Sequence, residues 1–218
     1  MAAAASQQIT PRRMIAFFAL VFGMFMAILD IQIVSASLSQ IQAGLAAAPD
    51  EVSWVQTSYL IAEVIMIPMS GFLARALSTR VFFSICAGGF TLASALCATA
   101  TTIDQMIVYR AFQGFIGGGM IPIAFAAAFT VFPREKQAMV TALVGLTVTL
   151  APTIGPTVGG YLTELFSWHW LFLVNVIPGI LATVICWTLV DFDRPEPGLL
   201  GRFDFVGLLF MALFLGSL

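Results

Sequence analysis

Tyr109–Pro122 reads YRAFQGFIGGGMIP and lies inside an apolar segment long enough to cross a lipid bilayer. Arg110 is costly there, because an arginine within the hydrocarbon costs from about 2.5 to about 17 kcal/mol unless it is paired or faces water. The glycines of this stretch would weaken a soluble helix, but in a membrane they let a neighbouring backbone approach closely. We therefore expect helix packing at Gly114, Gly117 and Gly118, beside a charge that needs a partner.

The composition indicates a membrane protein. Of the 218 residues 60% are hydrophobic and 9% are charged, and the mean hydropathy is +1.01. Average soluble domains carry about 25% charged residues. The net charge is -2 and no basic run or face indicates nucleic acid. A single histidine and three scattered cysteines predict no metal site, and no catalytic triad or phosphate-binding loop indicates an enzyme or ATP-driven transport.

The predicted fold is an all-α integral membrane bundle. A hydrocarbon core about 30 Å thick needs about 20 apolar residues per helix. We expect a six-helix transmembrane bundle over 14–190, between an N-terminal segment 1–13 and a linker 191–202. Residues 203–218 begin a seventh transmembrane helix that is truncated, so we expect a longer protein. The six predicted spans are 14–35, 53–74, 81–100, 104–131, 138–161 and 170–190.

The basic residues predict the orientation of the bundle. Eight of the nine lysines and arginines fall before the first span or in every second loop, and the ninth is Arg110. The intervening loops 36–52, 101–104 and 162–169 contain none. Because cytoplasmic loops carry the excess of lysine and arginine, the N-terminus and the linker 191–202 are predicted to be cytoplasmic.

Three ionisable residues lie within the predicted spans. By helix rise, Asp30 is ~25 Å from the cytoplasmic edge and Arg110 is ~9 Å below the outer edge, so their depths allow them to pair. Glu63 lies ~15 Å down, near mid-membrane. It shares one helix face with Gln56 and Tyr59, which predicts a polar stripe lining an interior cavity.

The three ionisable residues leave functional and structural interpretations open. The functional interpretation makes the two carboxyl groups candidates for proton binding. Structurally, Asp30 would be a carboxylate at the membrane interface, and Glu63 a buried, protonated and hydrogen-bonded carboxyl. Arg110 would then be only a partner for backbone carbonyl groups.

The fifth span contains the segment APTIGPTVGG at 151–160. Its prolines, Pro152 and Pro156, remove backbone donors and predict a bend. Its glycines, Gly155, Gly159 and Gly160, predict a close-packing face.

Four segments match, in order, the motifs of one transporter family. They are LDIQIV at 29–34, similar to L-D-x-T-I-V; RAFQGFIGG at 110–118, similar to R-x-x-Q-G-x-G-x-[AG]; the 151–160 segment, similar to [GA]-P-x-x-G-P-x-x-G-G; and WHWLFLVN at 168–175, similar to W-R-W-x-F-x-x-N. The loop GFLARALSTR at 71–80 is similar to G-x-L-a-D-r-x-G-r-[RK]. There Arg75 replaces the acidic residue and Ser78 the second glycine. On these residues the chain resembles the major facilitator superfamily, and within it the fourteen-helix drug:proton antiporters of the EmrB/QacA type.

This resemblance implies a function and a mode of action. The implied activity is proton-coupled export of lipophilic, often cationic compounds across the bacterial inner membrane by alternating access. The proton gradient would drive it without a cofactor. The partners would be membrane lipid, small lipophilic substrates, a periplasmic adaptor protein and an outer-membrane channel.

The site residues expected under this function form three groups. Asp30 and Arg110 take the proton-coupling roles on the resemblance, and Glu63 joins them on its depth and helix face. The 151–160 segment, with Pro152, Gly155, Pro156, Gly159 and Gly160, supplies the bending point. The expected substrate cavity is formed by Gln32, Gln56, Tyr59, Glu63 and Gln113.

Two alternatives remain open at this point. One is a truncated membrane protein that does not transport and acts by assembling with other chains. A reading frame that continues for roughly 250 residues, with eight more helices, would favour the transporter. A stop codon near Leu218 would favour the alternative. The other is an exporter of a specific metabolite or siderophore.

Overall fold

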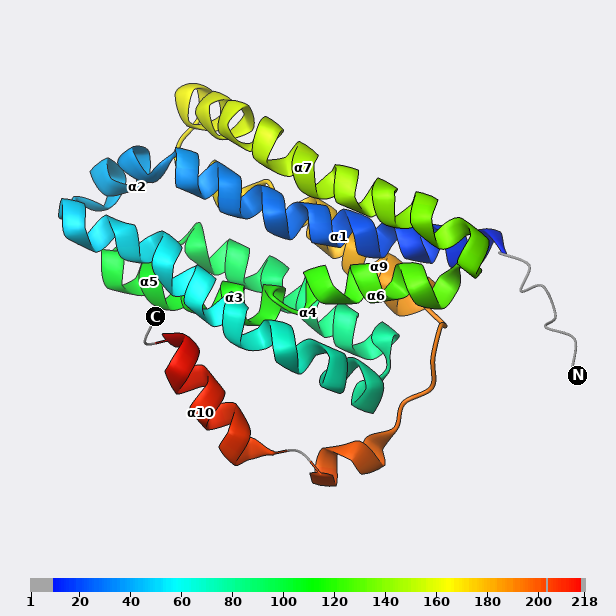
Figure 1. Ribbon diagram of the computed structural model, residues 1–218. Helices are drawn as coiled ribbons and strands as arrows, with labels where there is room; N and C mark the ends of the chain where they lie inside the picture. The colour runs from blue at the N-terminus through cyan, green and yellow to red at the C-terminus, as the bar shows by residue number, and fades with distance from the viewer. Residues whose placement is uncertain (1–9, 203, 217–218) are drawn as a thin grey trace, which may run out of the picture.

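The fold is a bundle of long helices that run back and forth between two ends (Figure 1). The computed structural model describes residues 10–202 and 204–216. Residues 1–9 of the predicted N-terminal segment, and residues 203, 217 and 218 of the predicted seventh helix, lie outside the described residues. The helices are α1 (Pro11–Ala36), α2 (Leu38–Leu45), α3 (Pro49–Leu77), α4 (Thr79–Cys97), α5 (Ile103–Gly117), α6 (Met120–Val131), α7 (Arg134–Leu165), α8 (Trp170–Leu173), α9 (Val176–Leu189), the 3₁₀ helix η1 (Pro197–Arg202) and α10 (Phe205–Gly216).

Among the described residues, six helical segments are long and apolar enough to cross a membrane, which confirms the predicted number. Four are single helices, and two join neighbouring elements. α5 and α6 together form the span Ile103–Val131, and α8 and α9 form the span Trp170–Leu189. In the first of these the helix is interrupted between Gly117 and Met120, within the glycine run.

Local signals account for several helix starts. Thr10 caps α1, where its side chain accepts a hydrogen bond from the Arg13 N–H and Pro11 occupies the first turn. Thr102 caps α5 in the same way, with its Oγ1 3.3 Å from the Gln105 nitrogen. Local capping residues thus define where the two helices that carry Asp30 and Arg110 begin.

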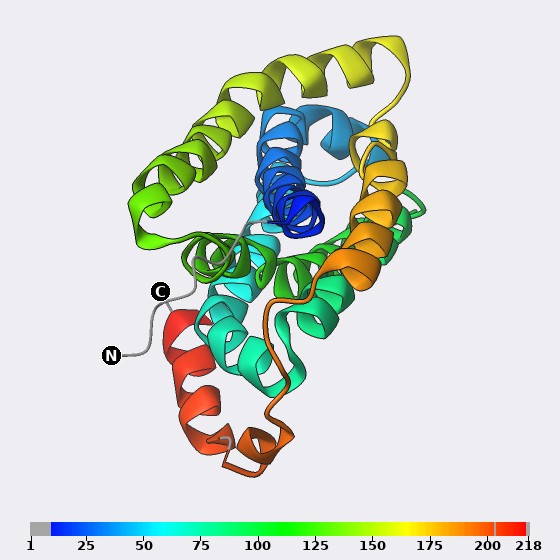
Figure 2. The ribbon, with the colours of Figure 1, turned by 90° about the vertical axis from the view of Figure 1, so that its right-hand side faces the viewer.

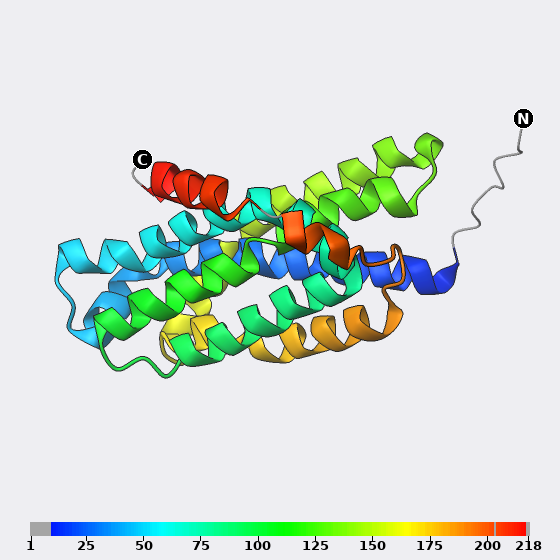
Figure 3. The ribbon, with the colours of Figure 1, turned by 90° about the horizontal axis from the view of Figure 1, so that it is seen from below.

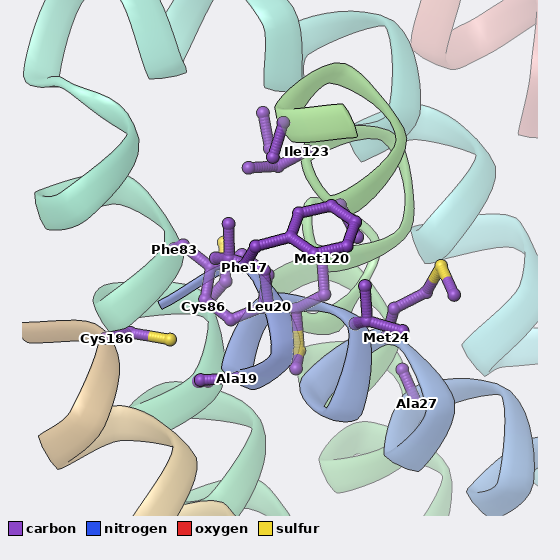
Figure 4. Close-up of a cluster of buried hydrophobic side chains, with 14 of the residues drawn as sticks. Phe17, Ala19, Leu20, Met24, Ala27, Phe83, Cys86, Met120, Ile123 and Cys186 are labelled. Atoms are coloured by element: carbon purple, nitrogen blue, oxygen red, sulfur yellow. The ribbon is translucent and has the colours of Figure 1, made fainter. Parts of the chain in front are cut away.

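The apolar core nearest the N-terminal end of α1 joins that helix to α4 and α6 (Figure 4). Phe17 and Met24 of α1 are fully buried there with Phe83 of α4 and Met120 of α6. Gly23 permits this packing, because a Cβ at that position would lie 2.9 Å from both the Met120 and the Phe83 side chains. These buried apolar contacts hold α1 beside α4 and α6.

Helix α7 packs along α1 through two of its three predicted glycines. A Cβ on Gly155 would collide with Gln32, and one on Gly159 would lie 2.9 Å from the Ser37 hydroxyl. Gly160 is exposed and has open space around it, so the structure does not place it on the packing face. The reason is geometric, since residues 155 and 159 are one helix turn apart whereas residue 160 is rotated away.

Prolines do not interrupt α7. The helix continues through Pro152 and Pro156, both of which are exposed, and its ribbon arches along its length (Figure 2).

After α9 the chain turns back along the bundle through η1 to α10, which lies against α3 (Figure 3). On the way, the Asp193 carboxylate caps α4: both of its oxygens lie 3.0 Å from the Thr79 nitrogen, and Oδ2 accepts from the Thr79 hydroxyl at 2.8 Å. The Glu196 N–H donates to the Arg75 carbonyl oxygen at 3.0 Å. The segment after the sixth span is therefore hydrogen-bonded to the end of α3 and the start of α4.

Ser78, at the start of α4, adopts φ 78° and ψ 151°. This region of backbone space is essentially restricted to glycine and costs a residue with a side chain about 1–3 kcal/mol. It is also the position where the sequence motif carries glycine. The Ser78 hydroxyl offsets little of this cost, since it accepts from the Val81 N–H at 3.5 Å.

We expect Ser78→Gly to raise the free energy of unfolding by on the order of 1 kcal/mol, because the strain is relieved and glycine is nearly as good an N-cap as serine. Thermal unfolding in detergent measures the change. Ser78→Ala is the matched control, because it keeps the Cβ and loses the hydroxyl, and it should lower the midpoint. A Ser78→Gly midpoint at or below that of Ser78→Ala would contradict the strain.

Candidate functional site

Asp30 and Arg110 form a buried ion pair between α1 and α5. The Arg110 Nη1 lies 2.6 Å from the Asp30 Oδ2, and both side chains are 0% exposed. Their predicted depths had made this pairing possible, and the structure brings them together. Because two unpaired charges would be very costly here, the contact accounts for an arginine inside an apolar span.

Amide side chains complete the hydrogen bonding of the carboxylate. The Asn175 Nδ2, between α8 and α9, donates to the Asp30 Oδ1 at 2.7 Å, and the Gln113 Nε2 donates to the same oxygen at 3.3 Å. Gln113 also donates to the Ser94 hydroxyl of α4 at 2.7 Å, while its Oε1 accepts from the Arg110 Nη1 at 2.7 Å. The network centred on Asp30 and Gln113 therefore connects polar groups from four of the six spans.

Helix α3 supplies the other wall around the guanidinium group. The Arg110 Nε donates to the Val55 carbonyl oxygen at 3.2 Å, and the Arg110 Cζ lies 4.2 Å from the centre of the Tyr59 ring. Phe172 lies on another side, with its ring centre 5.8 Å from the same carbon. The Arg110 Nη2 has no hydrogen-bond partner among the described residues. The N–H groups of this nitrogen are therefore not used by the network.

Two glycines, Gly114 and Gly118, allow α3 to approach this closely. A Cβ on Gly114 would collide with the Tyr59 carbonyl oxygen, and one on Gly118 would lie 2.8 Å from the Glu63 carbonyl oxygen. Gly117 faces α4, where an added Cβ would lie 2.8 Å from the Phe90 ring. These contacts agree with the packing expected of the glycines, and they set the distance between Arg110 and the α3 backbone.

Glu63 lies apart from the ion pair. It is 6% exposed, and its Oε1 has no hydrogen-bond partner among the described residues. The hydroxyl of Tyr59, one turn earlier on α3, is likewise buried and unpartnered within the described chain. Tyr59 thus has its ring against Arg110, and its hydroxyl has no hydrogen-bond partner among the described residues.

The residues expected to line a cavity lie in different parts of the bundle. Gln56 is partly buried on α3, and its Oε1 is unpartnered within the described chain, as in Tyr59 and Glu63. Gln32 lies beside Gly155, where α1 meets α7. Gln113 is fully buried within the charged network, so the structure places it there rather than on an open wall.

Asn175 and Ser94 were not expected at this site. Asn175 is the last residue of the 168–175 segment. A polar amide next to an apolar run is a signal that could have identified it as a site residue. Ser94 offered no such signal, because a lone serine in a membrane helix commonly bonds its own backbone. Among the described residues no group of three or more histidine, cysteine or acidic side chains is placed to hold a metal ion.

The strength of these contacts depends on the charge of the Asp30 carboxylate. In its charged form the Asp30 carboxylate holds Arg110, Gln113 and Asn175 together. A proton on that carboxylate would remove the negative charge and one acceptor, which weakens its contact with the guanidinium. Protonation of Asp30 would therefore loosen the side-chain contact between α1 and Arg110 of α5.

Among the described residues, six apolar spans around a buried charged network indicate a multi-pass membrane protein. Residues 20–216 match the Major Facilitator Superfamily, and the chain belongs to that family. It is 50% identical over 202 residues to the colistin resistance protein EmrB of Acinetobacter baumannii, covering 93% of this chain and 40% of that protein. It is 35% identical over 200 residues to the probable multidrug resistance protein EmrY of Escherichia coli, covering 92% and 39%. The chain thus spans about two fifths of the length of these curated relatives.

Solved structures share the fold at low sequence identity. The proton:xylose symporter XylE superimposes with a TM-score of 0.73 at 13% identity, over 96% of this chain and 52% of that one. The human organic anion transporter MFSD10 gives a TM-score of 0.71 at 13% identity, over 94% and 55%. These similarities establish the helical architecture of the family.

Proposed function

We propose that this chain provides six helices of a proton-coupled exporter of lipophilic and cationic compounds, working by alternating access in the bacterial inner membrane with its N-terminus in the cytoplasm. The observation that carries the proposal is the fully buried Asp30–Arg110 pair at 2.6 Å. A membrane protein retains such a pair at considerable energetic cost, and intramembrane ionisable groups mark ion pathways. The names of the drug-resistance relatives support the choice of cargo.

The proposed cycle uses the two states of Asp30. With the carboxylate charged, Arg110 is held between α1 and α3. When a proton binds, the guanidinium is released toward the unpartnered polar groups of Tyr59 and Glu63, and the helices that the glycines hold together can move. Helices α3 and α7 are the least covered of the six spans, so we place the remainder of the transporter against them.

Other parts of the assembly follow from the same proposal. Substrate would lie between this bundle and a second, repeat-related half, as in other secondary transporters. The proton gradient supplies the energy, and no cofactor takes part. A periplasmic adaptor and an outer-membrane channel would receive the exported compound.

Transport by the complete protein in sealed vesicles tests this function. A lipophilic cationic dye should accumulate against its gradient only when a pH gradient is imposed, and a protonophore should abolish the accumulation. Equal dye movement with and without the pH gradient would overturn the coupling. The absence of dye movement in either condition would favour a different cargo or a non-transporting assembly role.

Glu63→Gln should change which compounds are exported. A charged carboxylate attracts a cation in a low-dielectric site, so its loss should reduce export of a monovalent cation about tenfold, or ~1.4 kcal/mol, relative to a neutral compound. Resistance profiles to paired cationic and neutral compounds measure the ratio. Glu164→Gln, on an exposed part of α7, is the matched control and should leave the ratio unchanged. If Glu63→Gln leaves the ratio of cationic to neutral export unchanged, Glu63 has only a structural role.

A further inference from the structure

A groove lies between α4 and α9, on the outside of the bundle and away from the charged network. The two helices pack side by side (Figure 2), and the groove has a volume of about 280 Å³. Its walls are mainly apolar: Ile85 is 53% exposed and Val184 55% exposed, on a part of the bundle that would face lipid. The lining residues are Ser84, Ile85, Thr183, Val184, Trp187 and Thr188.

Two exposed arginines border one end of this groove. The Arg80 Cζ lies 6.0 Å from the centre of the Trp187 ring, and the Arg12 Nη2 donates to the Thr188 carbonyl oxygen at 3.0 Å. Neither guanidinium group forms an ion pair within the described chain. The nearby Asp193 carboxylate accepts hydrogen bonds from Thr79 at the start of α4 and forms no ion pair with either arginine within the described chain. Positive charge is therefore left available at the mouth of the groove.

A buried hydroxyl points to a ligand inside the groove. Ser84 is 5% exposed, and its Oγ has no hydrogen-bond partner among the described residues. It lies four residues after Arg80 on α4, which puts it on the same face and ~6 Å deeper in the membrane. In this conformation the hydroxyl does not bond its own backbone, and an acceptor that enters from the groove would satisfy it.

We propose that this groove binds one anionic glycerophospholipid from the leaflet at the arginine-rich end of the bundle. The phosphate lies between Arg80 and Arg12, where positive charge is unpaired. The Ser84 hydroxyl donates to an ester carbonyl, which in such a lipid lies about one helix turn below the phosphate. One acyl chain then follows the apolar walls at Ile85 and Val184. Basic pockets between membrane helices suit anionic headgroups, and Trp187 suits the interface depth.

A lipid is the occupant favoured over a free phosphate ion for two reasons. The groove walls beyond the arginines are apolar, and a phosphate ion would leave them uncovered. A free ion at the mouth would also leave the Ser84 hydroxyl without an acceptor.

Native mass spectrometry of the protein expressed from its complete reading frame tests the proposal. The purified protein is titrated with phosphatidylglycerol or phosphatidylcholine carrying identical acyl chains. We expect the first phosphatidylglycerol to bind about tenfold more tightly than phosphatidylcholine. Arg12→Gln combined with Arg80→Gln should abolish this preference. Ser84→Ala should weaken the binding of both lipids about threefold, since both contain the ester carbonyl.

Arg134→Gln combined with Lys136→Gln is the control, because it removes the same charge from exposed positions at the start of α7. It should leave the preference intact. Equal affinity of the wild-type protein for both lipids would overturn the proposal. So would an equal loss in the control variant, which would mean non-specific attraction, or displacement of phosphatidylglycerol by inorganic phosphate.

Discussion

Replacing Asp30 with asparagine in the complete transporter should abolish export driven by a proton gradient. Asparagine keeps the size of the side chain and part of its hydrogen bonding, but it cannot carry a proton or balance the charge of Arg110. The Arg110 guanidinium would then be buried without a counter-charge, which costs about 3–5 kcal/mol in comparable buried pairs. Dye accumulation in vesicles should fall to the level of vesicles without protein.

The matched control is Asp50→Asn, which makes the same chemical change at an exposed residue in the first turn of α3. It should transport at the wild-type rate. The amount of each variant in the membrane separates loss of transport from loss of protein. If Asp30→Asn, present at the wild-type level, moved dye against its gradient at the wild-type rate, the role given to Asp30 would be wrong.

Gly114→Ala should be nearly as damaging, although it adds only one methyl group. That group would collide with the Tyr59 carbonyl oxygen, which belongs to the rigid backbone of α3. Overpacking of this kind costs about 1–3 kcal/mol and sometimes more, because a whole helix has to move. The movement would also disturb the contacts of Arg110 with Val55 and Tyr59. We expect a lower unfolding midpoint together with an at least tenfold loss of transport.

Gly145→Ala is the control for this substitution. It lies within α7, and an added Cβ there would have nothing within 4 Å. Because alanine is the better helix former by about 1 kcal/mol, the control should be neutral or stabilising. Equal unfolding midpoints for Gly114→Ala and the wild-type protein would contradict the close approach of α3 and α5.

Much of the fold could be predicted because its signals are local. Twenty-residue apolar runs and the alternation of basic loops gave six spans, and the structure has six among its described residues. Depth alone made Asp30 and Arg110 possible partners, since a helix rises by a fixed amount per residue. The packing at Gly114 and Gly118 follows from the same physics, because small residues are what allow membrane helices to touch.

Features that depend on helix rotation could not be predicted. Asn175 reaches Asp30 only because of how the span formed by α8 and α9 is turned, and periodicity does not report this in a helix that is apolar on all sides. The same uncertainty applied to Gly160, which faces away from α1. The capping of α4 by Asp193 joins residues 114 positions apart, so no local pattern predicts it.

The central claim is that Asp30 either binds a proton or pairs with Arg110. Proton release on substrate binding measures this most directly. The purified complete protein is placed in weakly buffered solution with a pH indicator, and a lipophilic cation such as tetraphenylphosphonium is added. The account predicts that wild-type protein with Asp30 protonated releases this proton when the cation binds and the Asp30–Arg110 pair forms again. Asp30→Asn should bind the cation without releasing protons. Equal proton release from the wild-type protein and Asp30→Asn would contradict it.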